Sequence, residues 1–180
     1  MFWNEEIYRQ TISFAAKAHA SQKIPGMDIP YLKHLAAVTM EVASAILHTP
    51  EANFDIDFAI QCGLLHDTIE DTYIKYDEIE ISFGKKVADG VLALTKNESL
   101  PKENQMMDSL ERILLQPKEV RVVKICDRID NLYSPPIYWT PEKRKYYQKE
   151  GQLILDTLQG VCPYAEARLQ AKINAYSNYF

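Results

Sequence analysis

The sequence predicts an all-α protein of roughly eight helices, and three observations support this fold class. Apolar residues recur mostly at the three- and four-residue spacing of one helix face. Segments rich in proline, glycine or polar residues separate these periodic stretches. Segments with the period-two alternation that could form a sheet are missing from the sequence. With 180 residues and no repeat, low-complexity tract or Gly/Ser linker, the chain is expected to form a single domain over residues 1–180.

The first half of the chain contains three long helical stretches. The first is amphipathic, with an apolar face made by Ile7, Ile12, Phe14, Ala15 and Ala18. The segment SQKIPGMDIP, with two prolines and a glycine, should end it. A second helix is expected from about Tyr31 to Leu47. After the connection HTPEANFD, a very apolar and buried helix is expected from about Ile56 to His66.

The second half continues the helical pattern through shorter segments. YDEIEISFGKKVADGVLALTK predicts a short helix, Gly84, and then another helix, and KNESLPKEN predicts a polar loop. A helix to Leu115 follows, and Pro117 opens the next at a permitted first-turn position, although the run VRVV within it would also suit a strand. After the break SPPIYWTP, a helix capped by Thr140 should run to about Leu158, and a last helix should begin near Pro163.

Composition and charge narrow the classes of function. Hydrophobic residues make up 47% of the chain and charged residues 25%, which predicts a folded core rather than disorder. The net charge of −5 argues against nucleic acid or an anionic membrane as partner. Neither a signal peptide nor a membrane span is recognisable. The scattered Cys62, Cys126 and Cys162 fit neither a disulfide framework nor a thiolate zinc site, so a cytoplasmic location is expected. The sequence indicates no particular oligomer.

The segment LLHDTIEDT carries the strongest chemical signal. His66 and Asp67 end an apolar helix, and burying them side by side is costly unless something pairs them. A divalent cation does so, because imidazole nitrogen and carboxylate oxygen both ligate manganese, iron or zinc. Neighbouring helical residues point about 100° apart, so further ligands must come from other helices. His34 and Asp127 are the candidates, and the four together leave positions open for water, as a catalytic site needs.

Two more carboxylates follow the predicted ligands. Glu70 and Asp71 lie four residues after His66 and Asp67, so each lies one turn beyond its partner if the helix continues. In that position they would orient or deprotonate an attacking water molecule. A solvated helix end is the alternative for this acidic pair.

The order of motifs resembles a known family. AxxxH, PYxxH, LLHDTIEDT, FGxxVADGVxxLTK, LPK and VKICDRxxNL resemble the HD superfamily, and within it the hydrolase domain of RelA/SpoT-type proteins and the stand-alone small alarmone hydrolases. The resemblance runs from about Ala15 to Leu158. It implies an HD-domain helical bundle that removes pyrophosphate from the 3′ position of guanosine tetra- or pentaphosphate, normally with manganese. Some members also remove a phosphate from NADPH.

The resemblance also implies roles for individual residues. His34, His66, Asp67 and Asp127 match the metal ligands, Glu70 and Asp71 match the acidic pair that handles the water, and Lys102, Asn131 and Tyr147 match substrate contacts. The sequence departs from the family where a basic pair normally grips phosphate. Here Lys23 is followed by Ile24, and the loop is one residue shorter. The departure leaves the chemistry in place and puts the exact nucleotide, or its affinity, in question.

Three functions therefore stay open. The first is an alarmone-type 3′-pyrophosphohydrolase, and the second is an HD phosphohydrolase that acts on another nucleotide or on NADPH, which the Lys23–Ile24 pair favours. The third is a catalytically silent nucleotide-binding module, whose sign would be a lost ligand, and none is lost. For Asp127 the structural alternative is a salt bridge with a neighbouring cation. For Lys23, Lys102 and Tyr147 it is a surface or packing role.

Overall fold

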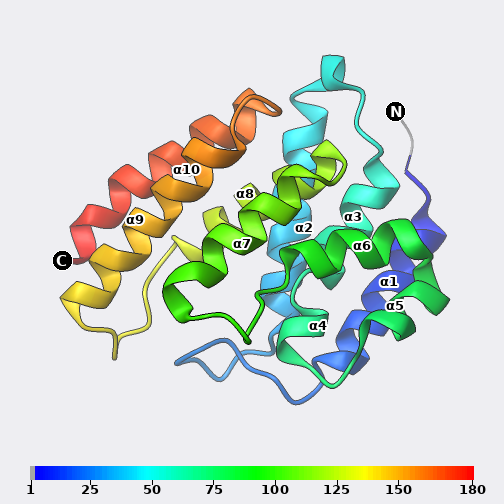
Figure 1. Cartoon of the computed structure of the whole chain (residues 1–180), viewed down its shortest axis with the longest axis horizontal. Helices are drawn as coiled ribbons and strands as arrows, with labels where there is room; N and C mark the ends of the chain where they lie inside the picture. The colour runs from blue at the N-terminus through cyan, green and yellow to red at the C-terminus, as the bar shows by residue number, and fades with distance from the viewer. Residues whose placement is uncertain (1–2) are drawn as a thin grey trace.

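The computed structural model describes residues 3–180, and within them every regular element is helical (Figure 1). The predicted all-α class is confirmed. The segment that was not predicted is the four-residue helix α4, which is separate from the helix before it. The α-helices are α1 (Glu5–Ala18), α2 (Leu32–Leu47), α3 (Ile56–Leu65), α4 (Thr68–Asp71), α5 (Tyr76–Phe83), α6 (Lys85–Leu94), α7 (Lys102–Leu114), α8 (Lys118–Asn131), α9 (Pro141–Leu158) and α10 (Pro163–Tyr176), and two short 3₁₀ turns cover Pro50–Ala52 and Ser177–Tyr179.

Local sequence signals account for most helix boundaries. The Asp55 carboxylate accepts a hydrogen bond from the amide of Phe58 at the start of α3. The Thr140 hydroxyl does the same at the start of α9, where Pro141 occupies the first turn. One boundary was predicted wrongly. The loop before α7 ends at Pro101, and the residues KEN that follow are already helical.

The centre of the bundle is α8, which packs against both α2 and α3 while those two pack against each other. Val120, Val122, Val123, Ile125 and Ile129 of α8 are all buried. The run VRVV is therefore helical, and its continuous apolarity reflects a helix that is covered on most sides. The strand alternative is wrong.

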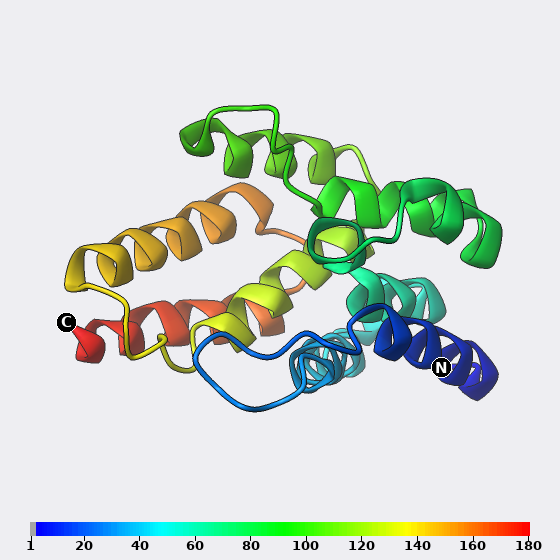
Figure 2. The same ribbon diagram turned by 90° about the horizontal axis from the view of Figure 1, so that it is seen from below.

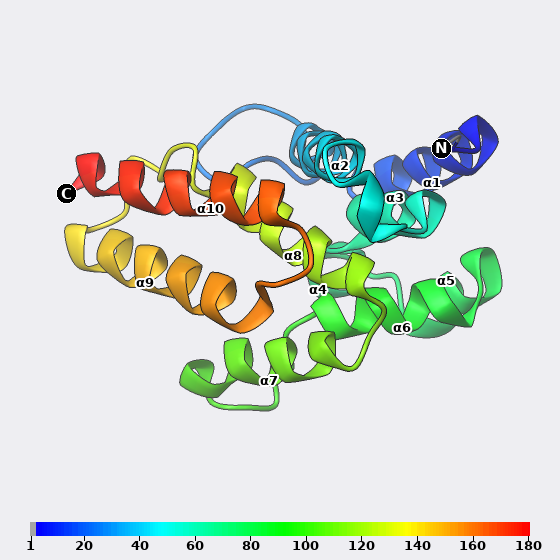
Figure 3. The same cartoon turned by 90° about the horizontal axis from the view of Figure 1, so that it is seen from above.

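Helices α9 and α10 lie side by side against one side of α8, whereas α5, α6 and α7 lie on another (Figures 2 and 3). At one end of the bundle, two irregular segments come together, the loop between α1 and α2 and the loop between α8 and α9. A Cβ atom added at Gly26 in the first loop would lie 3.3 Å from the ring of Tyr138 in the second. Among the described residues, no helix combines the length and apolarity needed to cross a bilayer.

Candidate active site and metal centre

The HD dipeptide lies at a break between two helices rather than inside one. His66 still has helical dihedral angles, but Asp67 departs from them with φ −99° and ψ 2°, and α4 starts at the next residue. The helix was expected to end at about His66, and α3 ends one residue earlier, at Leu65. The unbroken helix that would place Glu70 and Asp71 one turn beyond His66 and Asp67 is not formed. The break brings the two side chains together, because the Asp67 Oδ2 atom lies only 2.9 Å from the His66 Nε2 atom. In an unbroken helix the two residues would point about 100° apart.

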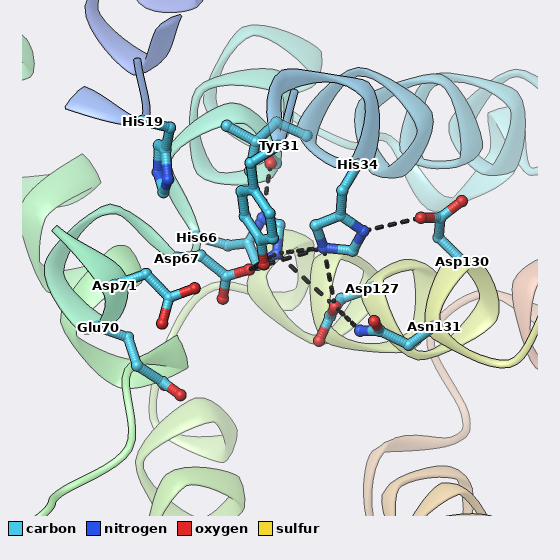
Figure 4. A network of polar contacts seen from close by, with 12 residues as sticks. His19, Tyr31, His34, His66, Asp67, Glu70, Asp71, Asp127, Asp130 and Asn131 are labelled. Atoms are coloured by element: carbon cyan, nitrogen blue, oxygen red, sulfur yellow. Dashed lines mark hydrogen bonds and ion pairs between the residues drawn. The ribbon is translucent and has the colours of Figure 1, made fainter. Parts of the chain in front are cut away.

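Four polar side chains from three regions of the chain converge at this break (Figure 4). The Nε2 atoms of His34, near the start of α2, and of His66 lie 3.3 Å apart. The Oδ1 atom of Asp127, on α8, lies 3.5 Å from the His34 Nε2 atom and 3.6 Å from that of His66. The Asp67 Oδ2 atom lies 3.6 Å from the His34 Nε2 atom. Three of the four predicted metal ligands, His34, His66 and Asp127, thus have donor atoms close enough to hold one ion. Asp67 adjoins them through its contacts with both imidazoles.

The close packing of α2 on α3 makes this convergence possible. Gly63, one turn before His66, faces Thr39 of α2, and a Cβ atom at position 63 would lie 3.2 Å from the Thr39 hydroxyl oxygen. A methyl group at this position would require the Thr39 side chain to shift by a few tenths of an ångström. The small residue therefore suits the close approach of α2 and α3, the helices that lead to His34 and His66.

The separations between these donor atoms suit a divalent cation. Ligand atoms held about 2.0–2.2 Å from one ion at tetrahedral or octahedral angles lie roughly 3.0–3.6 Å from each other. The donor set of imidazole nitrogens and carboxylate oxygens is the set that manganese, iron and zinc accept. His34, His66 and Asp127 are all buried, so the contacts among them need a compensating charge. The residues present therefore fit a metal ion.

The other nitrogen of each imidazole already has a partner. The His66 Nδ1 atom lies 2.8 Å from the backbone carbonyl oxygen of Gly63, to which it can only donate. The His34 Nδ1 atom lies 2.7 Å from the Oδ2 atom of Asp130. Both contacts favour the tautomer with the proton on Nδ1, and they leave each Nε2 lone pair directed at the shared position.

The two carboxylates are also held in place by neighbours. The Tyr31 hydroxyl donates to the Asp67 Oδ2 atom at 2.5 Å. Asp127 accepts from the amide of Asn131 at 2.5 Å and from the ammonium of Lys124 at 3.1 Å. The predicted alternative for Asp127, a salt bridge with a neighbouring lysine, therefore exists in addition to the contacts with the imidazoles.

The electrostatics of the cluster indicate a missing positive charge. Burial lowers the pKa of His66, but the charge of Asp67 and hydrogen bonds to Asp127 and Asp67 outweigh it and raise that pKa to about 9. Burial raises the pKa of Asp127, but Lys124 and the two imidazoles hold it well below its usual range. The carboxylates therefore favour positive charge at this position. A divalent cation would supply that charge and leave both imidazoles neutral.

The two predicted water-handling residues lie in different surroundings. Both oxygens of the Glu70 carboxylate are engaged by Lys96, one by its ammonium and one by its backbone amide, each at 2.8 Å. Asp71 instead lies beside Asp67 (Figure 4) and accepts from the amide of Gln22 at 2.8 Å. Partial burial and the charge of Asp67 raise the pKa of Asp71. Of the two, only Asp71 lines the pocket beside His34, one of the predicted metal ligands.

That pocket has a volume of about 300 Å³ and opens beside His34. Its walls are largely apolar and aromatic, and they come from the two loops at this end of the bundle, with Ile24, Met27, Ile29, Tyr133, Pro136 and Trp139 among them. Asn131 and Tyr147, two of the predicted substrate contacts, also line it. The buried guanidinium of Arg128 stacks over the Tyr147 ring, 4.0 Å from the ring centroid, and helps to fix it.

The structure does not bring the other two predicted substrate contacts into this pocket. Lys23 is exposed and forms an ion pair with Asp28 in its own loop. Lys102 is exposed at the start of α7. The basic residue that does line the pocket is Lys33, whose ammonium lies 3.4 Å from Asp130.

Sequence reasoning missed several residues that contact the predicted ones. Tyr31, Asp130 and Lys96 each make a direct hydrogen bond to a predicted ligand or acidic residue. Tyr31 and Asp130 lie inside quoted motifs, Tyr31 in PYxxH and Asp130 at the second unspecified position of VKICDRxxNL. Lys96 is the last residue of the LTK motif. It lies 26 positions after Glu70, and the sequence does not indicate a contact between residues so far apart.

Comparisons with known proteins show the family of this chain. A model of the HD domain family matches residues 11–159. The chain belongs to the HD domain family of hydrolases. Its relatives include the guanosine-3′,5′-bis(diphosphate) 3′-pyrophosphohydrolase MESH1 of Danio rerio, which is 30% identical over 166 residues, covering 89% of each chain. The corresponding enzyme of Homo sapiens is 29% identical over 156 residues, covering 84% of each.

This HD-domain protein is also similar to part of a longer protein and to a solved structure. The guanosine-3′,5′-bis(diphosphate) 3′-pyrophosphohydrolase of Aquifex aeolicus is 33% identical over 83% of this chain, which spans only 20% of that protein. A solved structure described as a metazoan ortholog of SpoT that hydrolyses ppGpp superposes with a TM-score of 0.81 at 24% identity, covering 97% of this chain and 98% of that one. This structural likeness supports the fold.

Proposed function

We propose that this HD-domain protein is a metal-dependent hydrolase that removes pyrophosphate from the 3′ position of guanosine-3′,5′-bis(diphosphate). The observation that carries the proposal is the convergence of His34, His66, Asp67 and Asp127. They lie at the edge of a pocket whose aromatic rings and side-chain amides suit a nucleotide. The substrate is proposed from the relatives, which bear the name of this activity. One domain over residues 1–180, a cytoplasmic location and a nucleotide as the small-molecule partner are parts of the same proposal.

The four converging side chains would hold the metal, for which we propose Mn²⁺. When bound, the ion supplies Lewis acidity toward a phosphoryl oxygen and toward water. The protein contributes fixed ligand orientations through the Nδ1 contacts of the two imidazoles. Further hydrogen bonds to Asp67 from Tyr31 and to Asp127 from Asn131 limit the motion of both carboxylates.

Asp71 is the residue we propose to accept the proton from the attacking water. Its carboxylate adjoins Asp67 and lines the pocket, and its raised pKa favours proton transfer near neutral pH. Glu70, the sequence neighbour of Asp71, would support this step by holding Lys96 nearby. The Gln22 amide keeps the Asp71 carboxylate turned toward the site.

The walls of the pocket suit the nucleoside part of the substrate. Tyr147 and Trp139 lie edge to face with ring centroids 4.9 Å apart, and both line the pocket. Such rings offer apolar area to a base at little entropic cost, because Arg128 already holds Tyr147 in place. Asn131 offers an amide for a hydroxyl or phosphate oxygen close to Asp127.

One observation favours a second candidate, a phosphohydrolase for another nucleotide or for NADPH. The pocket wall at position 24 is an isoleucine, and the adjacent Lys23 is paired with Asp28. A second diphosphate entering this pocket would therefore meet an apolar side chain at position 24 rather than a cation. A substrate with fewer charges beyond the reacting phosphate would lose less binding affinity from this missing cation.

A substrate panel separates these functions. The Mn²⁺-loaded protein is incubated with guanosine tetraphosphate, NADPH and deoxynucleotides, and released phosphate and pyrophosphate are measured, with Asp127→Asn as the inactive control. Pyrophosphate from guanosine tetraphosphate supports the first proposal. Phosphate from another member of the panel, with no pyrophosphate, supports the second. Metal binding without turnover of any member would leave a silent nucleotide-binding module.

A further inference from the structure

Asp130 lies behind the proposed metal centre without belonging to it. Its Oδ2 atom is 2.7 Å from the His34 Nδ1 atom, and its Oδ1 atom is 3.4 Å from the ammonium of Lys33. The carboxylate is only 10% exposed, whereas the Lys33 side chain is 55% exposed. Asp130 lies on α8 three positions after Asp127, so one helix carries a proposed ligand and the partner of another.

The two imidazoles of the centre are supported in different ways. His66 donates to the carbonyl of Gly63, three residues earlier, and this backbone contact holds whatever side chains surround it. His34 lies near the start of α2, and its Nδ1 partner comes from a residue 96 positions away. Its ring orientation therefore depends on a side chain. That side chain carries a negative charge, which makes the imidazole a stronger electron donor than a carbonyl would.

We propose that Asp130 is a positioning residue that fixes the Nδ1–H tautomer of His34 and strengthens its Nε2 atom as a metal ligand. The inference rests on the proposed metal centre and deepens it. It assigns the carboxylate–imidazole–metal arrangement to one of the two histidines only. Lys33 balances the charge of Asp130 from the solvent side and has no contact with the imidazole in this arrangement.

The first test measures the affinity for Mn²⁺ by titration of the metal-free full-length protein. Asp130→Ala should weaken binding about 10- to 100-fold, the usual cost of losing such a partner. Asp130→Asn should weaken it less, because the amide oxygen can still accept from the His34 Nδ1–H group without the charge. Lys33→Met is the matched control, since it removes the other partner of Asp130, and it should stay within about threefold of the wild type.

The second test reads the tautomer directly. In Zn²⁺-loaded protein with ¹⁵N-labelled histidine, NMR should show a protected Nδ1–H proton on both His34 and His66. In Asp130→Ala the His34 proton should exchange rapidly with water, while the His66 proton remains as an internal control. This readout also shows that the variant is folded, because the His66 contact depends on α3.

Each outcome bears on the inference. If the wild type binds Mn²⁺ and both Asp130 variants bind it within twofold, the role of Asp130 is wrong and the metal centre stands. The same holds if Lys33→Met loses as much affinity as Asp130→Asn. If His34 in the metal-loaded protein carries its proton on Nε2, that atom is not a ligand, and both the role of Asp130 and the ligand assignment of His34 are wrong. If the wild type binds no Mn²⁺, the metal centre itself is wrong and the inference falls with it.

Discussion

Raising the pH of the metal-free protein should destabilise it through His66. The pKa of this imidazole in the fold is about 9, above its ordinary value near 6.5, because Asp67 and Asp127 favour its charged form. A group with a raised pKa contributes its full stabilisation below the unfolded value and loses it as the pH rises through the folded value. The window is therefore pH 6.5 to 9. The side chain is 2% exposed, and the difference corresponds to roughly 3 kcal/mol of unfolding free energy.

Urea unfolding of chelator-treated protein between pH 6 and pH 9.5 would measure this loss. His66→Gln should flatten the dependence, whereas His48→Gln, which removes an exposed imidazole, should reproduce the wild-type curve. Mn²⁺ should reverse the trend, because the ion binds the neutral imidazole and so binds more tightly as the pH rises. A metal-free protein that is as stable at pH 9 as at pH 6.5, or a His66→Gln curve parallel to that of the wild type, would refute the reasoning.

The other predictions concern the metal, the acidic pair and the pocket wall. Asp67→Ala should lower the Mn²⁺ content of the purified protein, and equal metal content in variant and wild type would contradict the ligand assignment. Glu70→Gln and Asp71→Asn should keep fold and metal but lose turnover, by ~10²–10⁴-fold for a proton-accepting residue; near-normal kcat in both would make the pair structural. Ile24→Lys should lower KM for guanosine tetraphosphate about ten- to hundredfold with little change in kcat. Lys23→Met should leave KM unchanged, and steady-state kinetics of the two variants checks both statements.

Much of the fold was predictable because its boundaries depend on local chemistry. Thr140 and Pro141 start α9 through a cap and a preset φ angle, which any helix in that position would use. The end of the apolar run predicted a helix end at about His66, but the start of a separate helix at Thr68 had no such signal. The segment HDTIED contains neither proline nor glycine, and the departure from helical geometry at Asp67 accompanies contacts with Tyr31 and His34 that only the folded chain provides.

The sequence predicted the residues that converge at the candidate site, but few of the residues that hydrogen-bond to them. His34, His66, Asp67 and Asp127 stand in a recognisable order, and burying such groups together is costly unless a cation pairs them. The partners of these residues follow from three-dimensional proximity. Asp130 precedes Asn131, which was predicted to contact substrate, yet its relation to His34 depends on how α8 crosses α2. Spacing along one helix could not reveal that contact.

The sequence predicted one shared role for Glu70 and Asp71, but the structure gives the two carboxylates different partners. Each Glu70 oxygen accepts from Lys96, so Glu70 could take a proton from water only after giving up charge-assisted hydrogen bonds. Asp71 has the lighter constraint of one amide contact and already faces the pocket. These contacts support the proposal that Asp71 accepts the proton. The effect of Glu70 then passes through Lys96, whose pKa the charge of Glu70 raises to about 12 against the lowering effect of burial. Lys96 remains a fixed positive charge beside the acidic cluster for as long as Glu70 holds it.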